Sequence, residues 1–271
     1  MLLHWVGGKG ASVARILDKL PLVIHEYHEP FLGGGAVLEA VLRSGRVRGA
    51  VHASDLNAKL VAVFLAVKTD PDGLIAALEH LALDVSAEAY YAARARFNAA
   101  PTPALFVYLN KLCFRGLYRE NMAGEFNVPF GNYKTPKVVD PAAVRQLAEL
   151  YRLHDVRFAV RPWEDALAAP LADPRACVFL DPPFAKLAPT TFVAYTSGGF
   201  GPADGTRLLA RVREARARVV FCNHDVPEVV TALAGWDVER FSARRAIHCK
   251  RPGSRAWELL ASNQHARQAA L

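Results

Sequence analysis

A glycine triplet at residues 33–35 separates a β-prone run from a stretch of helical composition. Residues 23–29 favour a strand, residues 36–43 favour a helix, and residues 50–53 favour a second strand. A strand, a crossover helix and a further strand form a βαβ unit, which is typical of sheets whose strands run parallel. This unit restricts the fold to the α/β class.

The rest of the chain continues the alternation of strands and helices. Further strands are predicted at 156–160, 177–181, 219–223 and near 246–250. Further helices are predicted at 57–67, 72–81, 87–98 and 104–112. The pattern predicts a mostly parallel sheet with helices on both faces.

The region from 67 to 136 interrupts this alternation. It holds three of the predicted helices, and residues 114–136 are rich in glycine, asparagine, aromatic and basic residues without clear periodicity. Such a segment favours a hairpin or a large loop that carries function. A chain of 271 residues has room for one catalytic domain with an insertion. We therefore expect a catalytic domain at 1–66 and 137–271 and an inserted, mainly helical lobe at 67–136.

The glycine triplet also indicates a ligand site, because glycines between a strand and a helix let a ligand approach the backbone at the helix N-terminus. Asp55 follows Gly35 by twenty residues and ends the next strand, where a carboxylate can accept hydrogen bonds from ribose hydroxyls. A nucleotide-like cofactor and a purely structural turn both fit these residues. Leu38 occupies the position of the third glycine in the dinucleotide fingerprint, which disfavours NAD.

The tetrapeptide Asp181-Pro182-Pro183-Phe184 follows an apolar strand at 177–180. Ligands of α/β proteins bind at such carboxyl ends of strands. The prolines fix the backbone, so that the Asp181 carboxylate and the Pro182 carbonyl can both accept hydrogen bonds from one amino group. This arrangement suits the exocyclic N6 of adenine, with Phe184 stacked on a base that has left the duplex. The structural alternative is a capped strand end.

Charge and cysteine usage narrow the class of protein further. The formal charge of +7 and the pI near 9.4 favour a polyanionic partner such as nucleic acid. Cys113, Cys177, Cys222 and Cys249 form neither a CxxC pair nor a Cys/His cluster, so they suggest no zinc site and no disulfide framework. The N-terminus shows no signal pattern, and the longest apolar run, 60–67, is too short to span a bilayer. We expect a cytoplasmic protein without a membrane partner.

Five motifs, taken together and in order, resemble those of the DNA adenine methyltransferases of the Dam type. They lie at 5–9, 29–35, 54–57, 124–131 and 181–184. The resemblance implies a Rossmann-like sheet that binds S-adenosyl-L-methionine (AdoMet) and releases S-adenosyl-L-homocysteine. It also implies site-specific methylation of N6 of a flipped adenine in double-stranded DNA, by direct transfer without a covalent intermediate and without a metal.

The resemblance also implies roles for single residues. Those implied for AdoMet binding are Trp5, Lys9, Phe31, Gly33, Gly35, Asp55 and Asp181. Those implied for catalysis are Asp181, Pro182, Pro183 and Phe184. Phe184 stands where tyrosine is commoner in the family, but it keeps an aromatic face for the base.

DNA recognition is implied for a set of residues in and before the loop, namely Lys9, Phe114, Arg115, Tyr118, Arg119, Asn127, Pro129 and Lys134. Phe114 is expected to wedge into the base stack, and Arg119 to read guanine through its N7 and O6 atoms. Arg115 departs from the asparagine usual at its position, so a GATC-like target is favoured rather than fixed. The structural alternative for the arginines is a solvated loop with nonspecific phosphate contacts.

Other function classes fit fewer of these features. A DNA-binding module without catalysis does not need Asp55 and the Asp181 tetrapeptide together, and a nicotinamide oxidoreductase does not need DNA. Methyltransferases of RNA or of protein amides are the nearest rivals and often carry asparagine in place of Asp181. The resemblance of residues 114–119 to the family's hairpin favours duplex DNA. A cognate restriction endonuclease is a possible partner in a bacterium or phage, and the sequence leaves the oligomeric state open.

Overall fold

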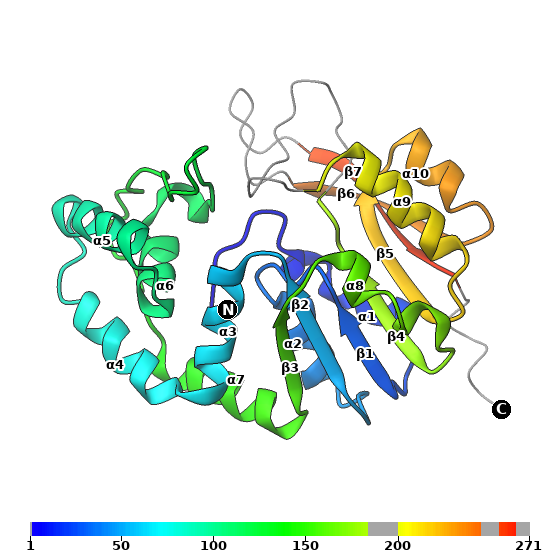
Figure 1. Cartoon of the computed structure of the whole chain (residues 1–271), viewed down its shortest axis with the longest axis horizontal. Helices are drawn as coiled ribbons and strands as arrows, with labels where there is room; N and C mark the ends of the chain where they lie inside the picture. Colours follow the sequence, from blue (N-terminus) through cyan, green and yellow to red (C-terminus); the bar gives the residue numbers. More distant parts are fainter. Residues whose placement is uncertain (1, 184–199, 245–254, 264–271) are drawn as a thin grey trace.

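The computed structural model describes residues 2–183, 200–244 and 255–263. Within these residues, seven strands form one sheet in the order β3-β2-β1-β4-β5-β7-β6 (Figure 1). They are β1 (Glu26–Glu29), β2 (Val51–Asp55), β3 (Val156–Val160), β4 (Ala176–Leu180), β5 (Arg218–His224), β6 (Asp237–Arg244) and β7 (Arg255–Ser262). Helices flank this sheet, so the predicted α/β class is confirmed.

The order of the strands in the sheet reverses next to the glycine triplet. Strands β3, β2, β1, β4 and β5 run parallel, whereas β7 lies antiparallel between β5 and β6. The order of the strands along the chain reverses between β1 and β4, which are neighbours in the sheet. Ligands of open α/β sheets bind at the carboxyl ends of the strands at such a reversal. The carboxyl ends of β1 and β4 are therefore the expected position of the site.

Each face of the sheet is covered by its own set of helices. Cys177 and Phe179 of β4 point into one apolar cluster, and Val178 and Leu180 point into the other, as the two-residue period of a strand requires. The helices of the first cluster that cover the sheet are α1 (Val13–Lys19), α2 (Ala36–Arg43), α3 (Ala58–Thr69) and α7 (Pro141–Leu153). Those of the second are α8 (Trp163–Ala166), α9 (Pro202–Arg213) and α10 (Pro227–Ala232).

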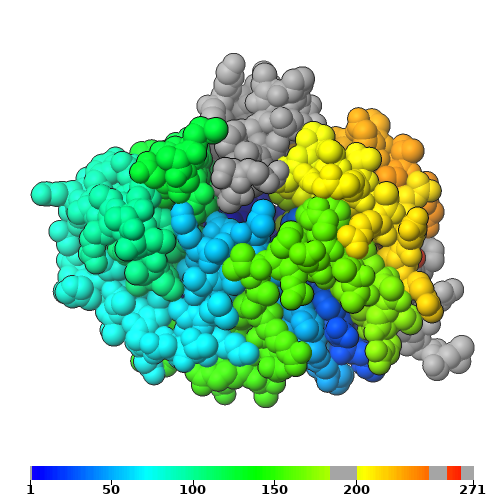
Figure 2. Space-filling model, viewed as in Figure 1, coloured from blue at the N-terminus to red at the C-terminus, as the bar shows by residue number. Residues whose placement is uncertain are grey.

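Between α3 and α7 the chain leaves the sheet and forms what we call the helical lobe, residues 71–131. Its helices are α4 (Pro71–Leu81), α5 (Ala87–Ala99) and α6 (Pro103–Leu112), and the one-turn helix η2 (Phe114–Gly116) follows. Asp70, Ser86 and Thr102 cap these three α-helices, each accepting a hydrogen bond from a backbone amide in the first turn. Figure 2 shows the lobe, in cyan to green, beside the rest of the molecule.

Two parts of the fold were not predicted. Helix α1 has seven residues and only one of them, Ile16, is buried, so its periodicity is weak. Strand β6 lies at the edge of the sheet and carries many polar residues, which weakens its apolar pattern, whereas β7 beside it is buried at five of its eight positions. The strand predicted near 246–250 lies outside the described residues. None of the helices in the described ranges combines the length and the apolar composition that crossing a membrane requires.

Candidate active site and nucleic-acid interface

The glycine triplet forms a tight turn between β1 and α2. Gly33 and Gly35 adopt positive φ angles of 49° and 71°, which favour glycine. A Cβ atom on Gly33 would lie 2.9 Å from Nε1 of Trp5, and one on Gly34 would lie 2.7 Å from the Trp5 Cβ. The Trp5 side chain thus packs directly on the turn. Without side chains of its own, the turn leaves its backbone accessible next to the N-terminus of α2.

Gly35 is expected to be far less tolerant of alanine than Gly45, which follows α2. Both residues have φ near +70°, so alanine at either costs about 1–2 kcal/mol of backbone strain. At Gly35 the new Cβ would also lie 2.8 Å from the Phe64 ring, whereas at Gly45 it would meet nothing within 4 Å. We expect Gly35→Ala to lower the free energy of unfolding in urea by about 1–3 kcal/mol more than Gly45→Ala. Equal losses would contradict the close packing of the turn.

Asp55, at the end of β2, is joined to the glycine turn. Its carboxylate accepts hydrogen bonds from the backbone amides of Gly33 and Asn57, both at 3.0 Å. Burial raises the pKa of Asp55, and these amides act in the opposite direction by favouring the charged form. The carboxylate therefore fixes the turn and retains lone pairs for a ligand.

Asp181 follows β4 and forms a buried ion pair with Lys9. The Lys9 Nζ lies 3.0 Å from Oδ1 of Asp181, and the two side chains are only 5% and 17% exposed. Lys9 belongs to the short helix η1 (Lys9–Ser12), and its ammonium also donates to the carbonyl of Gly7 at 2.6 Å. Pro182 is buried and Pro183 is partly buried beside this pair, whereas Phe184 lies outside the described residues.

Lys9 and Asp181 each stabilise the charged form of the other residue. Burial raises the pKa of Asp181, and the charge and hydrogen bond of Lys9 oppose that rise. Burial alone would lower the pKa of Lys9, but the negative charges of neighbouring groups, Asp181 foremost, hold it above its usual value. Lys9 therefore stays cationic and favours the carboxylate form of Asp181. This burial argues against the predicted contact of Lys9 with DNA.

Glu29 is a residue of this region that the sequence did not identify as a site residue. It ends β1, beside β4, and is 2% exposed, with its Oε2 accepting a hydrogen bond from the Tyr27 hydroxyl at 2.8 Å. Burial raises its pKa to about 8, and the charge of Asp181 adds to the rise. Glu29 is therefore mostly protonated at neutral pH. A glutamate that ends a buried strand is the signal that could have identified it.

Aromatic rings connect the glycine turn with the helical lobe. Trp5 stacks on Tyr118 with ring centroids 5.8 Å apart and on Phe106 at 6.5 Å. Tyr118 is 5% exposed and donates its hydroxyl to Glu120. The burial of this ring argues against the predicted DNA contact of Tyr118, which packs between lobe and turn instead. On the other side of the site, Phe31 meets Phe200 edge to face at 5.6 Å.

Residues 119–127 of the helical lobe form a small hairpin. Glu120 and Phe126 pair as an antiparallel bridge, and the Asn127 amide donates to the Arg119 carbonyl at 3.2 Å. The side chains of these last two residues also meet, because Nε of Arg119 donates to Oδ1 of Asn127 at 2.7 Å. Arg119 is exposed, and its Nη2 also donates to the Asn127 carbonyl at 3.5 Å, so Asn127 orients the guanidinium.

The other predicted DNA contacts gather near this hairpin. The backbone amide of Phe114 donates to the carbonyl of Pro129 at 2.8 Å, and the Arg115 guanidinium lies over the Phe114 ring, 5.1 Å from its centroid. The Phe114 ring is 43% exposed, unusual for a large apolar side chain. Arg115 has a φ of 56°, a strained conformation that is commoner at functional sites. Lys134 is exposed farther along the loop.

Comparisons with known proteins identify the family of this chain. The family model of D12 class N6 adenine-specific DNA methyltransferases matches residues 5–247. The chain is 34% identical over 272 residues to the type II methyltransferase M.MjaIII of Methanocaldococcus jannaschii, covering 92% of each protein. It is 34% identical over 242 residues to the DNA adenine methylase of Escherichia coli strain K12, covering 82% of this chain and 80% of that enzyme. The chain therefore belongs to the D12 class of N6 adenine-specific DNA methyltransferases.

Proposed function

We propose that this chain transfers the methyl group of AdoMet to N6 of an adenine flipped out of duplex DNA. The observation that carries the proposal is the buried pair of Lys9 and Asp181 beside the glycine turn. The two elements that the reaction needs, a cofactor cradle and a hydrogen-bond acceptor for N6, belong to the neighbouring strands β1 and β4.

The residues around the turn fit AdoMet. Gly33 and Gly35 form the turn that precedes the N-terminus of α2, and Asp55 offers acceptors for ribose hydroxyls. Phe31 and Trp5 supply apolar surface on either side. When bound, AdoMet supplies a methyl group on a positively charged sulfur, which an amino nitrogen can attack.

Asp55→Ala is expected to weaken AdoMet binding by about 10- to 100-fold. The substitution removes a charged acceptor, and hydrogen bonds to charged groups contribute about 1.5–3 kcal/mol each. It also releases the amide of Gly33 that the carboxylate holds. Calorimetric titration with AdoMet measures the loss, and Asp55→Asn, which keeps one acceptor oxygen, is expected to lose less. Unchanged affinity in Asp55→Ala would exclude Asp55 from the cofactor site.

Asp181 and Pro182 activate the adenine in this proposal. The Asp181 carboxylate and the Pro182 carbonyl accept hydrogen bonds from the two N6 protons, which localises the nitrogen lone pair for attack on the methyl group. The N6–methyl bond forms as the sulfur–methyl bond breaks, and Asp181 accepts the proton that N6 loses. No covalent enzyme intermediate is needed. Phe184 is proposed to stack on the flipped base.

We assign target recognition to residues 67–136 and catalysis to residues 1–66 and 137–271. The exposed ring of Phe114 suits a wedge into the base stack. Asn127 accepts hydrogen bonds from Nε and Nη2 of Arg119, which orients the exposed guanidinium proposed to read N7 and O6 of a guanine. Arg115, Pro129 and Lys134 complete the proposed DNA contacts on the same loop.

Arg119→Ala is expected to relax sequence preference at one base pair by about 10- to 100-fold, because a bidentate arginine–guanine contact contributes about 1–3 kcal/mol. Lys134→Ala serves as the matched control. It removes a proposed phosphate contact and is expected to weaken binding to all sequences alike. Rates on duplexes that differ in single base pairs measure both effects. An unchanged preference in Arg119→Ala would show that another residue reads the guanine.

Expression in a bacterial host without adenine methylation tests the proposed site specificity. Sequencing that detects N6-methyladenine is expected to find it at one short motif, with a GATC-like motif favoured, in DNA of the cytoplasmic nucleoid. Scattered methylation without a motif would contradict the proposed reading of guanine by Arg119. A restriction endonuclease that cleaves the same motif is the partner we propose.

A further inference from the structure

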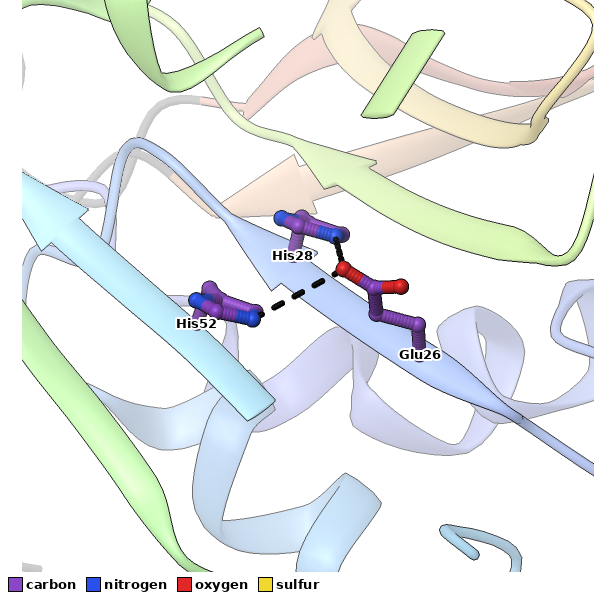
Figure 3. A group of neighbouring side chains, drawn as sticks. All are labelled: Glu26, His28 and His52. Carbon is purple, nitrogen blue, oxygen red and sulfur yellow. Dashed lines mark hydrogen bonds and ion pairs between the residues drawn. The ribbon is translucent and has the colours of Figure 1, made fainter. Parts of the chain in front are cut away.

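Two histidines and a glutamate lie together on a face of the sheet that the methyl-transfer site does not use. Glu26 and His28 are on β1, and His52 lies opposite His28 on β2 (Figure 3). His28 also pairs in register with Val178, which belongs to the cluster under α8, α9 and α10. Because side chains alternate along a strand, Glu29 lies on the opposite face.

Nε2 of each histidine lies near Oε1 of Glu26, and the ligand atoms of the three side chains all lie within 4.8 Å of one another. Oε1 of Glu26 forms a hydrogen bond with Nε2 of His28 at 2.9 Å and lies 3.7 Å from Nε2 of His52. Figure 3 marks both contacts with dashed lines. The two imidazole rings are parallel within 6°, with centroids 4.8 Å apart. Ligand atoms around a tetrahedral ion with bonds of about 2.0–2.1 Å are about 3.4 Å apart. The two glutamate–histidine distances lie on either side of that value.

The cluster is partly open to solvent. The side chains of Glu26 and His52 are 34% and 36% exposed, whereas that of His28 is 10% exposed. Solvent therefore reaches the cluster at Glu26 and His52. Asp173 adds negative charge near His28, and Arg157 and Arg161 add positive charge near His52.

We propose that Glu26, His28 and His52 bind a divalent transition metal, with Zn²⁺ the foremost candidate. Two imidazoles and a carboxylate are donors that Zn²⁺ accepts, and a water molecule can fill the fourth position. The ion would join β1 to β2, the strands that end in Glu29 and Asp55. The proposal is independent of the methyl-transfer reaction. The three residues come from two strands and contain no cysteine, which is why no motif in the sequence indicates the site.

Metal titration of the untagged protein, stripped with a chelator, tests the proposal. In calorimetry we expect one equivalent of Zn²⁺ to bind. In absorption spectroscopy we expect bound Co²⁺ to give the visible bands of a four-coordinate ion. Saturating Zn²⁺ is expected to raise the melting temperature by about 5 °C, because a ligand that binds only the folded state stabilises it. Absence of saturable binding at one equivalent would overturn the proposal.

Single substitutions distinguish Zn²⁺ binding at this cluster from Zn²⁺ binding elsewhere on the protein. His52→Gln and Glu26→Gln are expected to weaken Zn²⁺ binding more than about 100-fold, since even loss of an outer partner of a metal ligand costs 10- to 100-fold. His80→Gln removes an exposed histidine of α4 and is expected to bind Zn²⁺ normally. Circular dichroism without metal verifies that the variants are folded. Binding that survives both His52→Gln and Glu26→Gln would show that the ion binds elsewhere.

Discussion

Replacement of Asp181 by alanine is expected to lower the rate of methyl transfer by about 10³-fold, while AdoMet and duplex DNA still bind. Removal of one hydrogen-bonding group that acts on the reacting atoms typically costs 10²–10³-fold in kcat. Here the lost group is also the proposed proton acceptor, so the upper end is expected. Binding is retained because Asp55, the glycine turn and the hairpin of Arg119 are left intact.

Single-turnover kinetics with prebound AdoMet and DNA measure this loss directly. Asp72→Ala is the matched control, because Asp72 is 73% exposed on α4 and pairs only with Arg145 among the described contacts. Its rate is expected to match that of the unchanged protein. A normal rate in Asp181→Ala would remove the catalytic assignment of Asp181.

Replacement of Lys9 by methionine is expected to shift methyl transfer to a higher pH than in the unchanged protein. Burial raises the pKa of Asp181, and Lys9 opposes the rise. Without the ammonium, the pKa of Asp181 rises further, so that more of the carboxyl group is protonated at neutral pH and cannot accept a proton from N6. We expect kcat/KM at pH 7 to fall at least about 10-fold, a change of ~1.4 kcal/mol, and to recover partly as the pH is raised.

The pH profile of kcat/KM distinguishes this effect from a general loss of stability. The acid limb, where activity rises with pH, is expected to lie at higher pH in Lys9→Met. Lys19→Met removes a lysine that is 12% exposed and pairs with Asp237 at 2.7 Å, away from the glycine turn. Its profile is expected to be unchanged. An unchanged acid limb in Lys9→Met would show that Lys9 does not lower the pKa of Asp181.

Much of the fold was predictable because its signals are local. Helix α2 begins and ends where composition and the glycine triplet predict, and α3 to α6 deviate by at most two residues at their ends. The placement of Asp55 and Asp181 at carboxyl ends of strands was also predictable, because each follows a short apolar run. Parallel strands bring such residues to one edge of the sheet.

The contacts that were not predictable depend on how distant segments pack. Lys9 meets Asp181 because η1 lies near the end of β4, and Tyr118 is buried among the rings of Trp5, Phe106 and Phe126. Likewise, His28 and His52 meet through the register of β1 and β2, which no spacing along the chain specifies. Recognition residues were predicted by resemblance, and the structure adds that Asn127 orients Arg119.

Transfer of a labelled methyl group from AdoMet to unmethylated DNA, followed by digestion to nucleosides, tests the central claim most directly. Digestion of DNA treated with the purified protein is expected to release labelled N6-methyldeoxyadenosine. The Asp181→Ala variant is expected to leave the DNA unlabelled while it still binds AdoMet. Label on the N4 of cytosine, or no label despite intact AdoMet and DNA binding, would contradict adenine methylation by this site.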